Sequence, residues 1–144
     1  SMLAGEPIDV YNHGRMKRDF TYVDDIVEGI VRLLDKPPEP GGAPTGSWDA
    51  SDPDPAVSSA PYRILNIGNG APVDLMEFIG ALEAELGIEA QKNYLPMQPG
   101  DVEATWADTT DLEALTGHRP QTTIREGVRR FLAWYRPYHG IASE

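Results

Sequence analysis

The sequence predicts a small domain of mixed α and β structure, and three observations support this class. Short runs of β-branched and aromatic residues alternate with segments whose apolar residues recur at helical spacing. Glycine and proline mark the boundaries between these segments. The length, 144 residues, is that of one domain able to bury its own core. We therefore expect one compact α/β domain over residues 1–144.

Four short extended segments are predicted. The first contains Ile8, Val10 and Tyr11, and a turn at Gly14 follows it. Aromatic and β-branched residues favour an extended backbone over residues 18–22. Residues 62–67 (Y-R-I-L-N-I) indicate a buried strand before a glycine-rich turn, and residues 93–96 indicate a shorter strand.

Four helices are predicted from apolar spacing. One covers residues 23–34 and has two carboxylates in its first turn. Another covers residues 75–86 after a capping box formed by Asp74 and Glu77, and Gly87 ends it.

A third helix, a short one, opens at residues 107–109 and ends at Gly117. The last follows Thr123, which forms a capping box with Glu126. Its apolar face consists of four side chains: Ile124, Val128, Phe131 and Tyr135.

A proline-rich segment interrupts the pattern at residues 36–61. It holds seven of the 13 prolines, together with three glycines and four serines. Such a composition buries too little apolar surface to offset the entropy of ordering it. We expect a flexible surface loop between two ordered parts.

Charge and composition exclude several classes of function. Twelve basic residues against 23 acidic ones give a net charge of −11, which repels nucleic acid. No run of eighteen apolar residues could span a membrane, and the first residues lack a signal-peptide pattern, so we expect a cytoplasmic protein. Arg15, Lys17 and Arg18 nevertheless cluster within four positions. This cluster indicates either a local anion site or a solvated charged turn.

Several catalytic and cofactor motifs are missing. The chain has no cysteine, and its three histidines lack the spacing of a metal site, so we assign no metal. No G-x-S-x-G elbow indicates a hydrolase. The segment Gly68-Asn69-Gly70 lies between a predicted strand and a predicted helix, but Val73 replaces the third glycine of a dinucleotide fingerprint.

Four blocks in order resemble the extended short-chain dehydrogenases/reductases, the NAD-dependent epimerases and dehydratases. The blocks are residues 18–30 (R-D-F-T-Y-V-D-D-I-V-E-G-I), 65–70 (L-N-I-G-N-G), 98–108 (Q-P-G-D-V-E-A-T-W-A-D) and 127–135 (G-V-R-R-F-L-A-W-Y). Together they cover nearly the whole chain outside the proline-rich loop. Residues 95–102 (L-P-M-Q-P-G-D-V) most resemble the UDP-glucuronate 4-epimerases within that family.

The resemblance implies a small C-terminal substrate-binding domain without the Rossmann half that binds NAD. In the family that half carries the G-x-x-G-x-x-G turn and a catalytic Y-x-x-x-K pair. None of the six tyrosines here has a lysine four residues later, so we expect no catalytic residue in this chain. NAD is expected in the full-length enzyme and not on this chain.

The resemblance also implies a set of substrate-binding residues. Arg18 matches an arginine that reaches the diphosphate of a nucleotide sugar, and a pairing with Asp19 or Asp24 is the alternative. Asp101 matches an acidic residue beside the ribose, which accepts from hydroxyls or orients the arginine; capping the turn after Gly100 is its alternative.

The remaining substrate-binding positions lie in two other places. Gln98 stands where relatives often carry a second arginine, so a positive charge is lost there. The segment Asp9-Val10-Tyr11 matches the family strand whose backbone edge meets the uracil. Ordinary packing is an equal alternative for Tyr11.

The resemblance thus predicts the nucleotide-sugar-binding part of an NAD-dependent UDP-glucuronate 4-epimerase, inactive alone. A related 4,6-dehydratase or decarboxylase and a non-catalytic binding module are the alternatives. UDP-sugar is the expected ligand, with neither nucleic acid nor membrane as partner. The surface left by the missing half predicts a homo-oligomer that buries Ile64, Ile67 or the face of Ile26 and Ile30.

Overall fold

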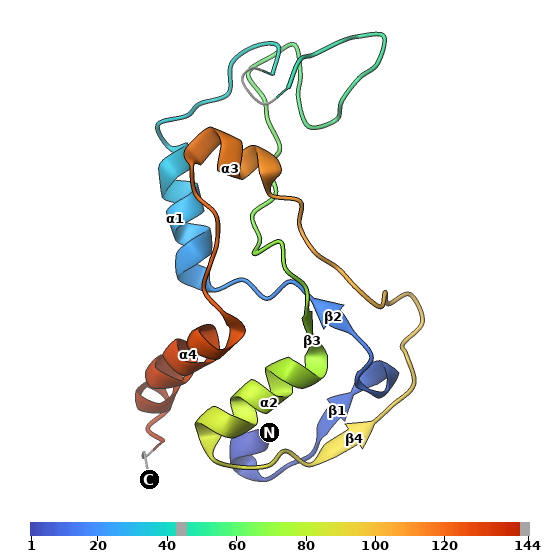
Figure 1. Cartoon of the computed structure of the whole chain (residues 1–144), viewed down its shortest axis with the longest axis vertical. Helices are drawn as coiled ribbons and strands as arrows, with labels where there is room; N and C mark the ends of the chain where they lie inside the picture. The colour runs from blue at the N-terminus through green and yellow to red at the C-terminus, as the bar shows by residue number, and fades with distance from the viewer. Residues whose placement is uncertain (43–45, 142–144) are drawn as a thin grey trace. The chain divides into compact units, whose positions relative to one another are not determined.

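A computed structural model describes residues 1–42 and 46–141, which form two compact units (Figure 1). The first unit combines Ser1–Phe20, Ala71–Trp106 and Thr122–Glu144. The second combines Thr21–Gly70 and Ala107–Gln121. Each unit has its own buried residues, and the expectation of one domain over residues 1–144 stays a prediction. The mixed α/β class predicted from the sequence is confirmed.

Two small sheets form the β part of the first unit. Strand β1 (Ile8–Val10) pairs in parallel with β4 (Lys92–Tyr94), and Asp9 lies opposite Asn93. Strand β2 (Lys17–Arg18) pairs antiparallel with β3 (Val73–Asp74). Of the extended segment predicted at residues 18–22, only Arg18 lies in this strand, and residues 19–22 form neither strand nor helix.

Between β1 and β2 the chain makes the short 3-10 helix η2 (Tyr11–Gly14). Tyr11, which the sequence placed at the end of the first strand, begins this turn instead. A second 3-10 helix, η1 (Met2–Ala4), precedes β1.

Helices α2 (Leu75–Leu86) and α4 (Ile124–Tyr138) pack against each other in the first unit. Ile79 of α2 forms a buried cluster with Val10 and Ala90. Because both helices follow strong apolar periodicity, their positions match the sequence prediction closely.

The two predicted capping boxes differ from the structure. At α2 the N-cap Asp74 makes no capping bond, and its carboxylate lies 3.7 Å from Lys17 Nζ. At α4 the Thr123 hydroxyl accepts from the Glu126 N–H at 3.3 Å, which is half of a box. The Glu126 carboxylate bonds Arg129 and Arg130 instead of reaching back. Ion pairing to a nearby cation therefore replaces the expected carboxylate cap at both sites.

The second unit contains α1 (Val23–Leu33) and α3 (Thr110–Thr116), as the sequence predicted. These helices pack where Gly29 is buried, and a Cβ at Gly29 would touch Leu112 and His118 at 3.6–3.7 Å. Leu112 is fully buried, and Pro120 is buried as well. One face of α1 packs on this small core.

The buried strand predicted at residues 62–67 is wrong. Only an isolated bridge between Arg63 and Val57 forms there, and Ile64 is 52% exposed. Side chains alternate between exposed and half-buried along the segment, as an extended chain requires. An apolar run becomes a buried strand only when neighbouring strands pair with it, and no described strand pairs with residues 62–67.

The proline-rich loop at residues 36–61 contains neither helix nor named strand in its described part; residues 43–45 lie outside the described residues. Val57 is buried inside the loop, beside Gly42 and Gly46. Backbone bonds from Gly41 N–H to Ser58 O and from Trp48 N–H to Gly41 O close it. The loop thus has a small apolar centre of its own, and its flexibility stays a prediction.

Candidate functional site

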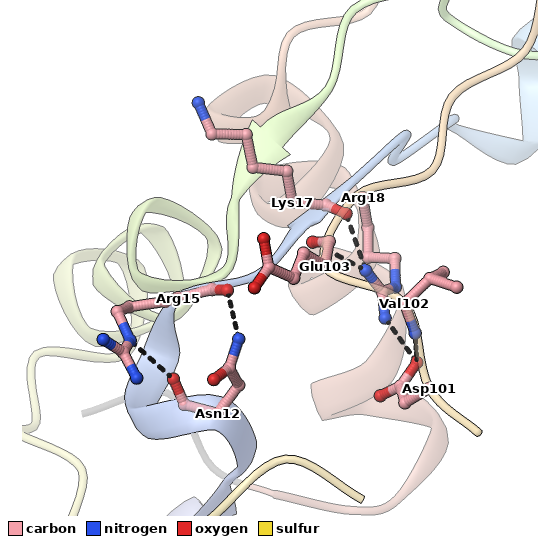
Figure 2. A network of polar contacts seen from close by, with 7 residues as sticks. All are labelled: Asn12, Arg15, Lys17, Arg18, Asp101, Val102 and Glu103. Carbon is pink, nitrogen blue, oxygen red and sulfur yellow. Dashed lines mark hydrogen bonds and ion pairs between the residues drawn. The ribbon is translucent and has the colours of Figure 1, made fainter. Parts of the chain in front are cut away.

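Arg18, at the end of β2, is held by three acceptors (Figure 2). Its Nη2 donates to Asp101 Oδ1 at 2.9 Å, and its Nη1 donates to Lys17 O at 2.8 Å and Glu103 O at 3.3 Å. Arg18 is 28% exposed and Asp101 32%. The carboxylate partner of Arg18 is therefore Asp101, 83 residues further along the chain. Since a guanidinium carries five N–H donors, about two remain for a ligand.

A tight turn carries Asp101 to Arg18. Gln98 O accepts from the Asp101 N–H at 3.2 Å, which closes a four-residue turn. Pro99 occupies the second position of this turn, and Gly100, with φ +85°, the third. This is the arrangement of a type II turn, in which proline fixes the first central residue and glycine supplies the positive φ of the second. The sequence Q-P-G-D thus dictates the local path of the chain.

Asp101 has two of the roles that the sequence allowed. The same oxygen, Oδ1, accepts from Arg18 Nη2 and from the Val102 N–H, both at 2.9 Å. It therefore orients the guanidinium and caps the turn at once. Its other oxygen, Oδ2, forms no hydrogen bond with the described part of the chain. Oδ2 can therefore accept a hydrogen bond from a ligand hydroxyl.

In the segment Asp9-Val10-Tyr11, the backbone has more groups available to a ligand than the side chains do. Val10 is fully buried in the core, and its carbonyl accepts from Leu95 N–H at 3.0 Å. Ile8 N–H donates to Gln91 O at 2.8 Å, also on the β4 side. Alternation along a strand then directs the N–H and C=O of Asp9 to the opposite edge. The Asp9 carboxylate accepts from Asn93 Nδ2 at 2.9 Å.

The structure brings together some of the predicted site residues and not others. Arg18 and Asp101 are in direct contact, and Gln98 joins them through its backbone while its side chain is exposed. Asp9 and the half-buried Tyr11 lie in the same unit at the other end of the η2 turn.

The basic cluster is only partly a solvated turn. Lys17 and Arg15 are exposed, whereas Arg18 is half-buried and paired. Arg15 directs its Nε to Asn12 O at 3.4 Å (Figure 2).

Asn12 was missed by the sequence reasoning. It is buried, adopts φ +49°, and its Nδ2 donates to Arg15 O at 2.8 Å. The sequence signal was weak, because Asn tolerates the left-handed region but the strong turn signal is an Asn directly before a Gly, and His13 separates the two here.

The glycine-rich segment Gly68-Asn69-Gly70 does not fit NAD. A dinucleotide site needs a strand, a tight turn and a helix whose N-terminal N–H groups face the pyrophosphate. Here no described strand leads directly into the segment, and α2 begins only at Leu75, after β3. Within the described ranges no cluster of three His, Cys, Asp or Glu could hold a metal ion. No helix among the residues described here is long and apolar enough to cross a membrane.

The fold has the architecture of the C-terminal part of extended short-chain dehydrogenases/reductases. The model of the NAD dependent epimerase/dehydratase family matches residues 1–44. The chain is 54% identical over 139 residues to protein CapI of Staphylococcus aureus, covering 96% of this chain and 40% of CapI. It is 49% identical over 133 residues to a probable UDP-glucuronate 4-epimerase of Rhizobium meliloti, covering 91% and 38%. The chain belongs to the NAD dependent epimerase/dehydratase family.

A solved structure agrees with this assignment. A mutant of the UDP-glucuronic acid 4-epimerase of Bacillus cereus, in complex with UDP-4-deoxy-4-fluoro-glucuronic acid and NAD, matches with TM-score 0.71 and 25% identity. The match covers 95% of this chain and 37% of that one. The chain spans about two fifths of the length of the curated relatives it matches.

Proposed function

We propose that this chain is the nucleotide-sugar-binding part of an NAD-dependent UDP-glucuronate 4-epimerase and is inactive alone. The observation that carries the proposal is the Arg18–Asp101 pair, formed where β2 meets the 98–101 turn. It matches the family position at which an arginine meets a diphosphate. The relatives named above as UDP-glucuronate 4-epimerases support this substrate.

In this proposal Arg18 binds the diphosphate. Asp101 holds the guanidinium in place, so little of its freedom is lost when an anion arrives. Its remaining donors form charge-assisted hydrogen bonds to phosphate oxygens, for which the planar guanidinium is better suited than an ammonium. Arg15 and Lys17 add positive potential on an otherwise acidic protein.

The ribose and the base extend from one end of the diphosphate, and the sugar extends from the other. The outward edge of Asp9 meets the uracil through its backbone, and Tyr11 supplies an aromatic surface next to it. Asp101 Oδ2 accepts from a ribose hydroxyl, and the Gln98 amide donates where relatives place a second arginine. Each of these contacts positions the substrate and leaves the acid-base chemistry to other groups.

In this proposal the redox step belongs to the rest of the enzyme, which the coverage of 37% of the relative solved with NAD supports. NAD bound there would supply the hydride exchange at C4 that interconverts UDP-glucuronate and UDP-galacturonate through a 4-keto sugar, with the C4 hydroxyl proton leaving to and returning from a group outside this chain. This chain contributes remote binding energy, which holds the sugar in register for that step.

We also propose that the isolated chain associates with itself through α1. Five aliphatic side chains on this helix and at its C-cap, Leu34, are between 49% and 73% exposed: Val23, Val27, Ile30, Val31 and Leu34. Such a contiguous apolar face is unusual on a monomer's surface. Ile64, in the same unit, is 52% exposed and extends the available apolar surface.

Titration with three ligands tests the proposal. UDP-glucuronate, followed by calorimetry, is expected to bind the chain, while NADH, followed by fluorescence, is expected to show no specific binding. dTDP-glucose serves as the competitor that a 4,6-dehydratase would prefer. Micromolar binding of NADH, or equal affinity for both nucleotide sugars, would contradict the assignment.

A further inference from the structure

The turn between β1 and β2 has an unusual backbone. Asn12 and His13 have φ of +49° and +52°, and outside glycine no other described residue has a positive φ. The left-handed region is disfavoured for residues with a Cβ, and Asn is among the few that tolerate it. Two such residues in succession persist only where surrounding contacts hold them.

Three hydrogen bonds and one packing contact hold this turn in place. The buried Asn12 amide donates from Nδ2 to Arg15 O at 2.8 Å, and Asn12 O accepts from the Arg15 N–H at 3.0 Å. His13 N–H donates to Leu95 O at 3.0 Å, beyond the end of β4. Gly14 packs so closely that a Cβ there would lie 2.7 Å from Met76 Sδ. The turn is thus fastened to itself, to the segment after β4 and to α2.

This turn joins two parts of the proposed site. Tyr11 is its first residue, and Arg18 follows seven positions later on β2. Between them Met16 is buried, and its carbonyl accepts from Leu75 N–H at 2.8 Å. The separation of Tyr11 from Arg18 therefore depends on the path of the turn, which the Asn12 amide closes.

We propose that Asn12 is a positioning residue of the nucleotide site, an inference that rests on the proposed function. Its amide fixes the distance between the groups that meet the base and the diphosphate, so that one UDP molecule contacts both. Asn meets two requirements at once. It tolerates the left-handed backbone, and its N–H closes the turn on Arg15 O. Gly provides only the first, and an ionised Asp cannot donate.

Two substitutions separate this role from ordinary stability. Asn12→Gly keeps the backbone conformation without the amide, and Asn12→Asp keeps the size without the donor. Asn66→Asp is the matched control, because Asn66 Nδ2 also donates to a backbone carbonyl, that of Asp108 at 3.1 Å, in the other unit. Each variant is titrated with UDP by calorimetry, and with uridine and pyrophosphate separately by NMR.

We expect both Asn12 variants to bind UDP roughly tenfold more weakly, while uridine and pyrophosphate change by less than about twofold, because only the linked ligand depends on the spacing. The control should bind all three ligands as the wild type does. UDP affinity unchanged in both Asn12 variants would overturn the role of Asn12 and leave the proposed function standing. A proportional loss for all three ligands would also overturn it, in favour of a purely structural role. A wild-type chain that does not bind UDP would overturn the proposed function as well.

Discussion

The contact between Arg18 and Asp101 should be measurable as a coupling free energy. The perturbation is a double-mutant cycle of Arg18→Ala, Asp101→Ala and the two together. The two side chains form a charge-assisted bond of 2.9 Å and are 28% and 32% exposed. Bonds to charged groups contribute about 1.5–3 kcal/mol, and exposed ion pairs about 0.2–1 kcal/mol. For a pair of intermediate exposure we expect a coupling of about 1 kcal/mol.

Urea unfolding of the four proteins at neutral pH measures this coupling. Asp101→Asn is the informative additional variant, since its amide oxygen can still accept from Val102 N–H and Arg18 while the charge is lost. It should retain roughly half of the coupling. A coupling below about 0.3 kcal/mol, which is within the additivity error of distant sites, would refute a specific contact.

Three further predictions concern stability and association. In thermal unfolding, Gly14→Ala should destabilise the chain by at least about 1 kcal/mol more than Gly87→Ala. Both glycines have a positive φ, but only at Gly14 would the new Cβ clash with a neighbouring side chain, that of Met76. Hydrogen bonds from Arg129 and then Arg130 lower the pKa of Glu126 to about 2, so the stability that the ionised Glu126 contributes is complete above its ordinary pKa near 4.5 and is lost as pH falls toward 2. Glu126→Gln should therefore remove this part of the acid dependence of unfolding. An unchanged pH profile in that variant would contradict the prediction. Ile30→Glu should shift light scattering toward the monomer if the exposed α1 face associates, and an unaltered oligomer would locate the interface elsewhere.

Helices were predicted from the sequence more reliably than strands. The helix at Val23–Leu33 has its apolar spacing and its starting carboxylates within one continuous segment, so local information sufficed. Residues 62–67 have the composition of a strand, but pairing depends on neighbours that the segment does not specify. The same limit explains why the predicted capping boxes do not form in full. The carboxylates of Asp74 and Glu126 form ion pairs with basic side chains, which the local sequence pattern did not predict.

The candidate site was predicted as a set of positions and not as a geometry. Arg18 and Asp101 were both chosen through the family resemblance, which offered their contact as one alternative, while their spacing of 83 residues alone does not predict it. The turn at Pro99-Gly100 could be predicted from the sequence, because proline and glycine occupy the positions that a type II turn requires. The sequence analysis missed Asn12 because a left-handed backbone at a residue other than glycine has a weak sequence signal.

The central claim is tested most directly by calorimetric titration with UDP. The proteins to compare are the wild-type chain, Arg18→Ala, Arg18→Lys and the control Arg125→Ala. Arg125 is exposed near the start of α4 and plays no part in the proposed site. We predict that Arg18→Ala weakens binding by ~1.5–3 kcal/mol, or roughly 10- to 150-fold, that Arg18→Lys recovers only part of it, and that the control binds as the wild type does. UDP affinity that is unchanged in Arg18→Ala would contradict the assignment of Arg18 to the diphosphate.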